Sequence, residues 1–283
     1  MQIGNFRGFE VQLRDPGIAL VTFNHPERLN GMRGELKRDL GEILLQAQVD
    51  DAVRVVVITG TGRGFSAGDD ITGREVDYEG TQQLLPTVIR GERGPMASYG
   101  GLRGFSQSLN LAVRSLDKIS IAAINGVAIQ TGLSLALACD FRIASKEARL
   151  GSATLRFGLQ PDEGGHALLV QILGVARAMD FLMKNRIVSA NEALEMGLVN
   201  EVVEHDELMG RTMELATQLA NGPQAAMRML KRAVYNASEL TLQQAMDDIA
   251  TKTAVTDHHP DAREGLAAFR EKRTPVFNRP QSS

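Results

Sequence analysis

The sequence predicts an α/β fold in which parallel strands alternate with helices, followed by a helical tail. Apolar runs at residues 53–58 and 119–124 are typical of buried parallel strands. Residues 35–49 repeat apolar side chains at helical spacing just before the first of these runs. Strand, helix and strand in this order indicate parallel crossover units.

The N-terminal residues predict a β-hairpin. Residues 9–23 alternate apolar and polar side chains around Asp15-Pro16-Gly17, which is a turn signal. The helix over 35–49 and the strand over 53–58 follow. Residues 71–109 then carry scattered glycines, prolines and charges, and we expect a long excursion over the site. A surface insertion without a role is the alternative, and helical spacing returns only near Leu109.

The second half of the chain predicts one more crossover and then helices. We expect residues 127–129 to continue the strand 119–124, and residues 130–132 to open a helix that ends at Cys139. Residues 140–144 predict a short strand. Further helices are expected at residues 166–173, 176–183, 191–196, 207–221, 223–235, 241–254 and 260–272. We divide the chain into a core, residues 1–200, and a helical C-terminal region, residues 201–283.

The composition is that of a globular protein and excludes several partners. Among 283 residues, 43% are hydrophobic and 23% charged, as in ordinary folded domains. The net charge of -3, the absence of Trp and the lack of a long basic run argue against nucleic acid binding. Cys139 is the only cysteine, which fits a reducing compartment. With no signal peptide and no membrane-spanning apolar run visible, we expect a cytoplasmic protein.

A loop nearly free of large side chains is the strongest chemical signal. The residues TGTGRGFSAGDDI, at positions 59–71, follow the strand 53–58. Such a loop offers backbone N–H groups, which stabilise an oxyanion. Its spaced glycines also begin a dinucleotide-binding pattern, but no helix opens directly after them. The loop therefore predicts a reaction in which a carbonyl becomes an enolate.

A second junction of this kind lies at residues 130–132. It joins a strand to a helix, and a helix N-terminus presents unpaired N–H groups and a partial positive charge. Because both junctions follow parallel strands, they could converge on one oxygen. The alternative is that both are ordinary strand-to-helix turns.

Several motifs in a fixed order resemble those of the crotonase (enoyl-CoA hydratase/isomerase) superfamily. They are PERLN at 26–30, GFSAGDDI at 64–71, NGVAIQTG at 125–132, ACD at 138–140, FGLQP at 157–161, the segment 190–199 and AFREKR at 268–273. The resemblance implies a crotonase-like ββα spiral with a C-terminal helical trimerisation region. It implies an acyl-CoA thioester as ligand and a homotrimer or dimer of trimers. CoA is then part of the substrate, and no separate cofactor is expected.

The resemblance also assigns site residues. It places the oxyanion donors at the N–H groups of Ala67 and Thr131, where a threonine stands in place of a more usual glycine. The residues that it assigns to binding are Arg28, Leu29, Gly68, Asp70, Phe269 and Lys272. Phe269 and Lys272 would approach the adenosine end of CoA from a neighbouring subunit, although an exposed helix face is the alternative. Asp70 would brace the loop by hydrogen bonds.

The chain departs from the family pattern at the two glutamates of a hydratase. Ser134 and Thr154 stand at those positions, and neither hydroxyl is a strong base near neutral pH. Asp162 stands where dienoyl-CoA isomerases and the isomerase of the phenylacetate pathway carry a catalytic aspartate. Dehalogenases of the family place a nucleophilic carboxylate here too, but they also rely on a histidine that this chain lacks. The resemblance therefore favours double-bond isomerisation, with Asp162 moving the proton.

Two other carboxylates and two other functions stay open. Asp69 and Glu163 could assist in acid–base chemistry, and either would serve a divergent hydratase. A non-catalytic acyl-CoA binder is the alternative from another class. Asp162 and Glu163 could also simply cap the helix 166–173. The His258-His259 pair precedes Pro260 and predicts a helix cap, so no metal site is expected.

Overall fold

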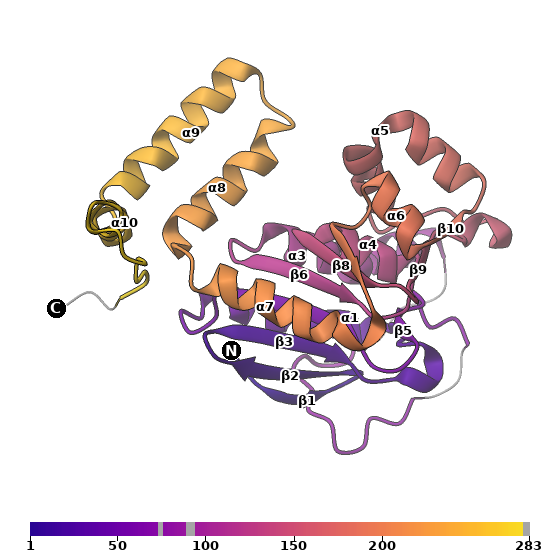
Figure 1. The fold of residues 1–283 in the computed structure, drawn as a ribbon. Helices are drawn as coiled ribbons and strands as arrows, with labels where there is room; N and C mark the ends of the chain where they lie inside the picture. Colours follow the sequence, from indigo (N-terminus) through magenta and orange to yellow (C-terminus); the bar gives the residue numbers. More distant parts are fainter. Residues whose placement is uncertain (73–75, 89–93, 280–283) are drawn as a thin grey trace.

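The centre of the molecule is a seven-stranded sheet (Figure 1), within the residues that the computed structural model describes, 1–72, 76–88 and 94–279. Across the sheet the strands are β1 (Gly4–Phe6), β2 (Phe9–Arg14), β3 (Ile18–Phe23), β4 (Val55–Gly60), β6 (Ile119–Ile124), β8 (Phe141–Ser145) and β11 (Glu201–Val203). The first three pair antiparallel, which confirms the predicted hairpin. From β3 onward all neighbours are parallel, which confirms the predicted crossovers.

A second sheet, made of four short strands, lies next to the seven-stranded sheet. Its order is β10 (Ile187–Ser189), β9 (Arg149–Gly151), β7 (Val127–Ile129) and β5 (Gly64–Ser66). Each of β5, β7 and β9 follows a strand of the large sheet and precedes a helix. This repeat of two strands and a helix is the ββα spiral that the sequence predicted.

The strand at residues 127–129 is a correction. It does not continue β6 but pairs with β5 and β9 in the small sheet. The chain changes sheets at Gly126, where a Cβ atom would overlap the carbonyl oxygen of Arg63. Only a glycine allows the two backbones to approach this closely.

Helices cover both faces of the large sheet. Along β4, Val56 and Ile58 point to one face and join the core cluster that includes α1 (Gly34–Val49). Val55 and Val57 point to the other face, which α7 (Leu208–Ala220) covers (Figure 1). Because both faces are buried, the strand is a continuous apolar run. The predicted helix over 35–49 is confirmed.

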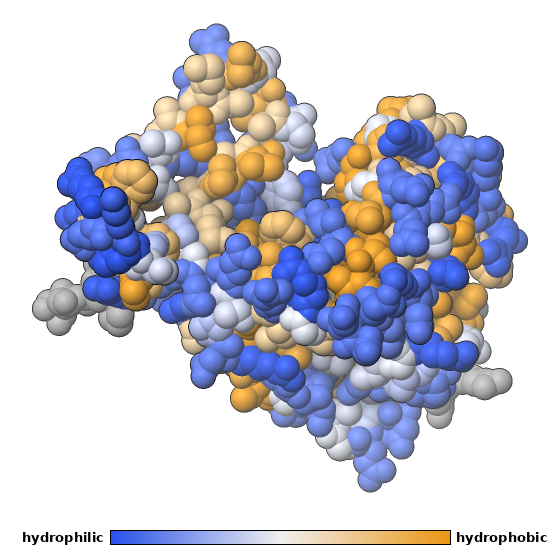
Figure 2. Space-filling model, in the orientation of Figure 1, coloured by the Kyte–Doolittle hydropathy of each residue, from blue (hydrophilic) through white to orange (hydrophobic). Residues whose placement is uncertain are grey.

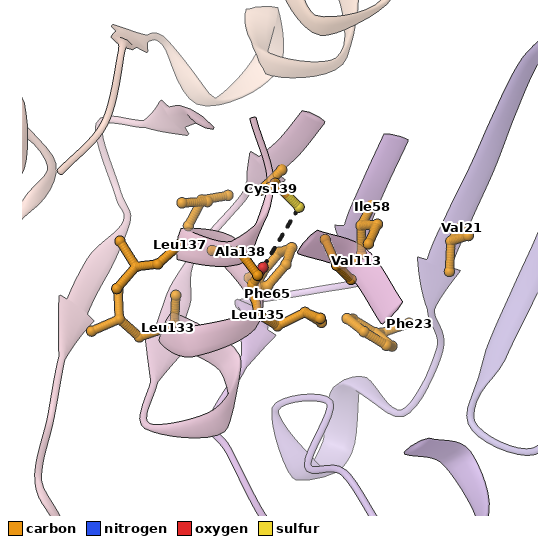
Figure 3. Packing of buried hydrophobic residues seen from close by; sticks show 14 of the residues in the cluster. Val21, Phe23, Ile58, Phe65, Val113, Leu133, Leu135, Leu137, Ala138 and Cys139 are labelled. Atoms are coloured by element: carbon orange, nitrogen blue, oxygen red, sulfur yellow. Dashed lines mark hydrogen bonds between the residues drawn. The ribbon is translucent and has the colours of Figure 1, made fainter. Parts of the chain in front are cut away.

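Helix α4 (Thr131–Ala138) runs through the middle of the core, and each of its residues is buried. Figure 3 shows Leu133, Leu135 and Leu137 of this helix among apolar side chains from the strands and α3. At its end the Cys139 thiol donates a hydrogen bond to the carbonyl of Leu135, with sulfur and oxygen 3.5 Å apart. Burial raises the pKa of Cys139 to about 12, so the thiol stays protonated and unreactive.

The excursion over residues 71–109, which follows the glycine-rich loop at 59–71, becomes helical earlier than predicted. Helix α2 (Pro95–Gly101) runs into a π-helical segment, η2 (Leu102–Gln107), and then into α3 (Ser108–Ser115). The sequence placed the return of helix near Leu109, because glycines and exposed positions hide the pattern before it. Proline at the first position of α2 is a helix start signal. Residues 73–75 and 89–93 of the excursion lie outside the described residues.

Helix α5 (Gly165–Met183) is broken at Gly174, whose φ of 74° and ψ of 164° are not helical. The sequence predicted two helices here, over 166–173 and 176–183, and both are confirmed. By length and composition alone, α5 could cross a membrane, with a mean hydropathy of 1.4, and 28% of it is buried inside the molecule. The break interrupts it, so neither half alone spans a bilayer.

The C-terminal helices form an arm that leaves the sheet (Figure 1). The arm consists of α8 (Gln224–Ala237), α9 (Leu242–Asp257) and α10 (Pro260–Glu271), close to the predicted bounds. No residue of α9 is buried, and large apolar side chains are exposed along all three helices (Figure 2). The His259 ring accepts a hydrogen bond from the N–H of Asp261 at 3.2 Å, which confirms the predicted helix cap.

The remaining elements are short. They are α6 (Ala190–Met196) and the 3-10 helices η1 (Pro26–Arg28), η3 (Thr154–Phe157) and η4 (His205–Glu207). The Ser189 side chain caps α6 by accepting from the N–H of Glu192. Helix η1 matters for the site because it leads directly to Leu29, which lies beside the glycine-rich loop at 59–71.

Candidate active site

The glycine-rich loop at 59–71 and the strand-to-helix junction at 130–132 meet at the start of α4. A Cβ atom on Gly68 would lie 3.5 Å from the backbone nitrogen of Thr131 and 2.9 Å from the carbonyl oxygen of Ile129. A Cβ atom on Gly132 would overlap the carbonyl oxygen of Ser66. The two junctions therefore lie against each other, and glycine permits it because the backbones are in direct contact. Gly68 also has a φ of 95°, which favours glycine.

The free N–H groups at this junction are not both those predicted. The N–H of Ala67 donates to the carbonyl of Leu29, 2.8 Å away, and is not available to a ligand. The N–H of Asp69 has no hydrogen-bond partner among the described residues, while its neighbour Asp70 donates to the carbonyl of Met32 at 3.0 Å. Thr131 begins α4, so its N–H has no acceptor within the helix. The structure therefore rules out the Ala67 N–H as a free donor and leaves the N–H groups of Asp69 and Thr131 without an acceptor among the described residues.

The carboxylate of Asp69 is held by a cation and a hydroxyl. Its Oδ1 lies 2.6 Å from the Lys37 ammonium and 2.6 Å from the Thr131 hydroxyl. Lys37 is buried, with 4% of its side chain exposed, and also donates to Ser106 of η2 at 2.6 Å. The Asp69 side chain is half exposed. This network fixes the loop against α4 and engages the carboxylate that the sequence offered as an acid–base candidate.

Asp70 braces the loop, as the sequence predicted. Its buried carboxylate accepts from Arg28 at 2.8 Å, Arg33 at 3.1 Å and both the N–H and the hydroxyl of Thr72. Burial raises the pKa of Asp70, but the hydrogen bonds from Thr72 and the two arginines outweigh it and hold the pKa far below its usual range. Together with the bond from Ala67 to Leu29, this connects the residues 28–29 to the loop.

A second carboxylate, Glu163, also contacts the first turn of α4 and is buried, with 2% exposed. It accepts hydrogen bonds from the Gln130 amide at 3.1 and 3.2 Å, the Ser134 hydroxyl at 3.1 Å and the N–H of Asp162 at 2.8 Å. No cation among the described residues pairs with it. Burial, and next the adjacent Asp162, raise the pKa of Glu163 to about 7.

Asp162 is exposed and lines a cavity of about 480 Å³, together with Gln107, Ser152, Leu155 and His166. Its carbonyl accepts from the Gln107 amide at 2.8 Å, and its side chain interacts with that of the neighbouring Glu163, whose pKa it raises. Helix α5 has Gly164 at its N-cap and no side-chain cap. The capping alternative for Asp162 and Glu163 is therefore not what the structure shows.

The comparisons with known proteins agree with this fold. Residues 14–280 match the model of a family described as enoyl-CoA hydratase/isomerase. The chain belongs to this family, within the crotonase superfamily. The 1,2-epoxyphenylacetyl-CoA isomerase of Escherichia coli strain K12 is 36% identical over 264 residues, which cover 93% of this chain and 95% of that protein.

Other relatives in the family have different names. Carnitinyl-CoA dehydratase of Escherichia coli strain K12 is 35% identical over 273 residues, covering 93% of this chain and 96% of that protein. The crystal structure of an enoyl-CoA hydratase from Bacillus anthracis superposes with a TM-score of 0.86 at 30% identity, over 96% of this chain and 99% of that one. The family thus includes isomerases, dehydratases and hydratases.

The two hydroxyls that the family resemblance puts at the hydratase glutamate positions have different surroundings. Ser134 is buried and donates to Glu163. The Thr154 hydroxyl is buried and has no hydrogen-bond partner within the described residues. Neither residue can act as a strong base.

The tail residues that the family resemblance assigns to CoA are remote from the loop of the same chain. Phe269 is 82% exposed on α10, and the exposed Lys272 ends this helix. Figure 1 shows α10 on the arm, well away from α4 and β5. Among the described residues, no three His, Cys, Asp or Glu side chains cluster as metal ligands.

Proposed function

We propose that the protein isomerises a double bond of an unsaturated acyl-CoA thioester. The observation that carries the proposal is the exposed Asp162 side chain, which lines a cavity beside the buried Glu163, while by the family resemblance Ser134 and Thr154 stand at the hydratase glutamate positions. A single carboxylate can move a proton between two carbons of one substrate. Hydration needs a base for water, and neither hydroxyl supplies one.

In the proposed reaction, the N–H groups of Asp69 and Thr131 hold the thioester oxygen. Asp162 removes a proton from a carbon next to the double bond, and the electron pair of that C–H bond moves into the conjugated system to give a dienolate. The proton then returns from Asp162 to the other end of the system. No atom is gained or lost, and each donor stabilises the negative oxygen, an effect of roughly 100-fold or more in rate.

The substrate's CoA part would pass Arg28 and Leu29, which lie beside the loop that carries Gly68 and Asp70. We propose that Phe269 and Lys272 reach the adenosine end from a second subunit. The exposed apolar side chains of the arm support a homotrimer, alone or as a dimer of trimers, because such surface is normally covered.

Two alternatives make different demands on the site. A divergent hydratase would need Asp69 or Glu163 to activate water, but Asp69 is engaged by Lys37 and Glu163 is buried. A dehydratase among the relatives keeps this function as the second candidate. A non-catalytic acyl-CoA binder would use the same oxyanion donors and consume no substrate.

The test is Asp162→Asn with a panel of enoyl-CoA and dienoyl-CoA esters. Because acid–base catalysis contributes on the order of 100-fold or more, turnover should fall by at least that factor while thioester binding stays within about two-fold. Hydration removes the conjugated absorbance and isomerisation of a diene shifts it, so spectra separate the two reactions. The matched control is Asp206→Asn, an exposed carboxylate in η4. Unchanged turnover in Asp162→Asn would refute the assignment.

A further inference from the structure

Glu163 connects the proposed base to the proposed oxyanion donor. Its Oε2 accepts the N–H of Asp162 at 2.8 Å, so one carboxylate oxygen holds the backbone of the residue before it. The Gln107 amide holds the Asp162 carbonyl at 2.8 Å, and the Asn110 amide holds the Glu163 carbonyl at 2.9 Å. Three hydrogen bonds thus hold the main chain of residues 162 and 163, while the Asp162 side chain lines the cavity.

The same carboxylate holds the turn that leads into α4. It accepts from the Gln130 amide and the Ser134 hydroxyl, and the Gln130 side-chain oxygen accepts from Ser152 at 3.0 Å. Gln130 has a φ of 50° and a ψ of -112°, a conformation that a non-glycine residue adopts only when its surroundings impose it. The next residue is Thr131, whose N–H points out of the helix start.

We propose that Glu163 is a positioning residue, which sets Asp162 and the N–H of Thr131 at a fixed distance for proton transfer and oxyanion binding. This inference rests on the proposed isomerase function. It deepens that function by naming a residue that touches neither the thioester nor the reacting carbons. Glu163 acts through Asp162 on one side and through Gln130 on the other.

The ionised form of Glu163 suits this role. Three donors point at its two oxygens, and protonation would place an O–H donor on an oxygen that already faces a donor. Asp162 is the titratable group in contact with it, since α4 carries no charged residue. The other charged groups on the packed elements, as far as described, face elsewhere: Arg103 of η2 lies near Tyr99, Arg114 of α3 near Tyr235, and His166 of α5 on the cavity.

The ionisation of Glu163 falls in the neutral range. Burial, and next the adjacent Asp162, raise its pKa to about 7, so its hydrogen-bond network changes as pH passes through neutrality. Because the positioning role needs the ionised form, turnover should rise with pH through this range.

The test is Glu163→Gln, which keeps the shape but turns one acceptor oxygen into a donor that faces another donor. The readout is deuterium exchange at the γ carbon of crotonyl-CoA in deuterium oxide, which reports dienolate formation without net isomerisation. We expect exchange and kcat to fall by about 10-fold or more, with binding of the saturated ester butyryl-CoA within about two-fold. We also expect the neutral-range ionisation to vanish from the pH profile of the variant. The control is Glu204→Gln, an exposed carboxylate that pairs with Lys146.

The outcomes separate this inference from the function on which it rests. If wild type exchanges, Asp162→Asn does not, and Glu163→Gln keeps the rate and pH profile of wild type, the positioning role is refuted and the isomerase stands. If wild type exchanges no hydrogen, the proposed function fails and the role fails with it. Should Glu163→Gln not fold, Ser134→Ala removes one donor and keeps the carboxylate. The role then requires the ionisation in the pH profile to move upward, and an unmoved profile refutes it.

Discussion

Two carboxylates hold the start of α4, in different electrostatic surroundings. Asp69 is half exposed and bound to the Lys37 ammonium, whereas Glu163 is buried among an amide, a hydroxyl and an N–H. Asp69 bonds the side chain of Thr131, the first residue of α4, and Glu163 bonds Ser134 in the same turn. Asp69 is thus part of an ion pair that holds the loop, whereas burial and the adjacent Asp162 raise the pKa of Glu163 to about 7. We call these two networks the Asp69 corner and the Glu163 corner. Two carboxylates that bind the same helix turn therefore differ because one has a cation beside it and the other is buried among uncharged donors.

The largest expected effect is on how stability depends on pH at the Glu163 corner. The pKa of Glu163 rises from an ordinary 4.5 to about 7 on folding, so the folded state binds the proton more tightly. Its contribution to stability is complete below pH 4.5 and is lost as pH rises through about 7. The free energy of unfolding of wild type should therefore fall, relative to Glu163→Gln, by about 3 kcal/mol across this window.

Urea unfolding at a series of pH values measures this difference. Comparison with the variant is needed because Asp70 has the opposite sign: its lowered pKa gives stability that is lost as pH falls. Subtracting the Glu163→Gln curve removes that contribution, since Asp70 is present in both proteins. Parallel curves would show that Glu163 does not titrate within this range and would remove the contrast between the corners.

The next largest effect is expected at the other corner, from Lys37→Met. Methionine keeps the length and apolar stem of the lysine but leaves Asp69 and Ser106 without their shared donor. Removing one partner of a buried ion pair is strongly destabilising, but Asp69 is half exposed, so we expect a loss of about 2 kcal/mol. Urea unfolding at neutral pH measures it.

A double-mutant cycle supplies the control for this prediction. Asp69→Asn removes the charge that Lys37 neutralises, so the double variant should be more stable than the sum of the two single losses. The coupling should reach at least about 1 kcal/mol for a partly buried pair. Strictly additive losses would mean that Lys37 stabilises the fold by packing alone and that the Asp69 corner is not held by charge.

The fold could be predicted where local pattern decides it. Period-two and helical spacing identified the hairpin and α1, and Gly174 marked the break in α5. The sheet to which β7 belongs and the start of α2 were not predicted, for physical reasons. Strand β7 leaves the large sheet because Gly126 meets Arg63, a contact that spacing along the chain does not reveal. The start of α2 is masked because its residues are small and exposed, so they leave no apolar stripe.

The site shows the same division between local and distant information. The sequence could predict that two bare junctions meet, because both follow parallel strands of one sheet. Which N–H is free depends on residues 29–32, which run beside the loop and take the N–H of Ala67. The partners of Glu163 and Asp69 come from α4 and α1, far along the chain. Lys37 and Asp39 interrupt the apolar residues of α1 and are both buried, and charged residues are seldom buried without a partner.

The smallest loss of stability is expected at Thr131, whose hydroxyl donates to Asp69. Thr131→Val keeps the β-branched shape and the backbone N–H but removes the hydroxyl that donates to Asp69. Because Lys37 still binds the carboxylate, we expect a loss of about 1 kcal/mol in urea unfolding. Binding of butyryl-CoA should stay within about three-fold, since the proposed oxyanion contact is made by the N–H. If Thr131→Val is instead as damaging as Lys37→Met, then the hydroxyl, and not the cation, holds Asp69 against α4, and the contrast between the two corners rests on hydrogen bonding alone.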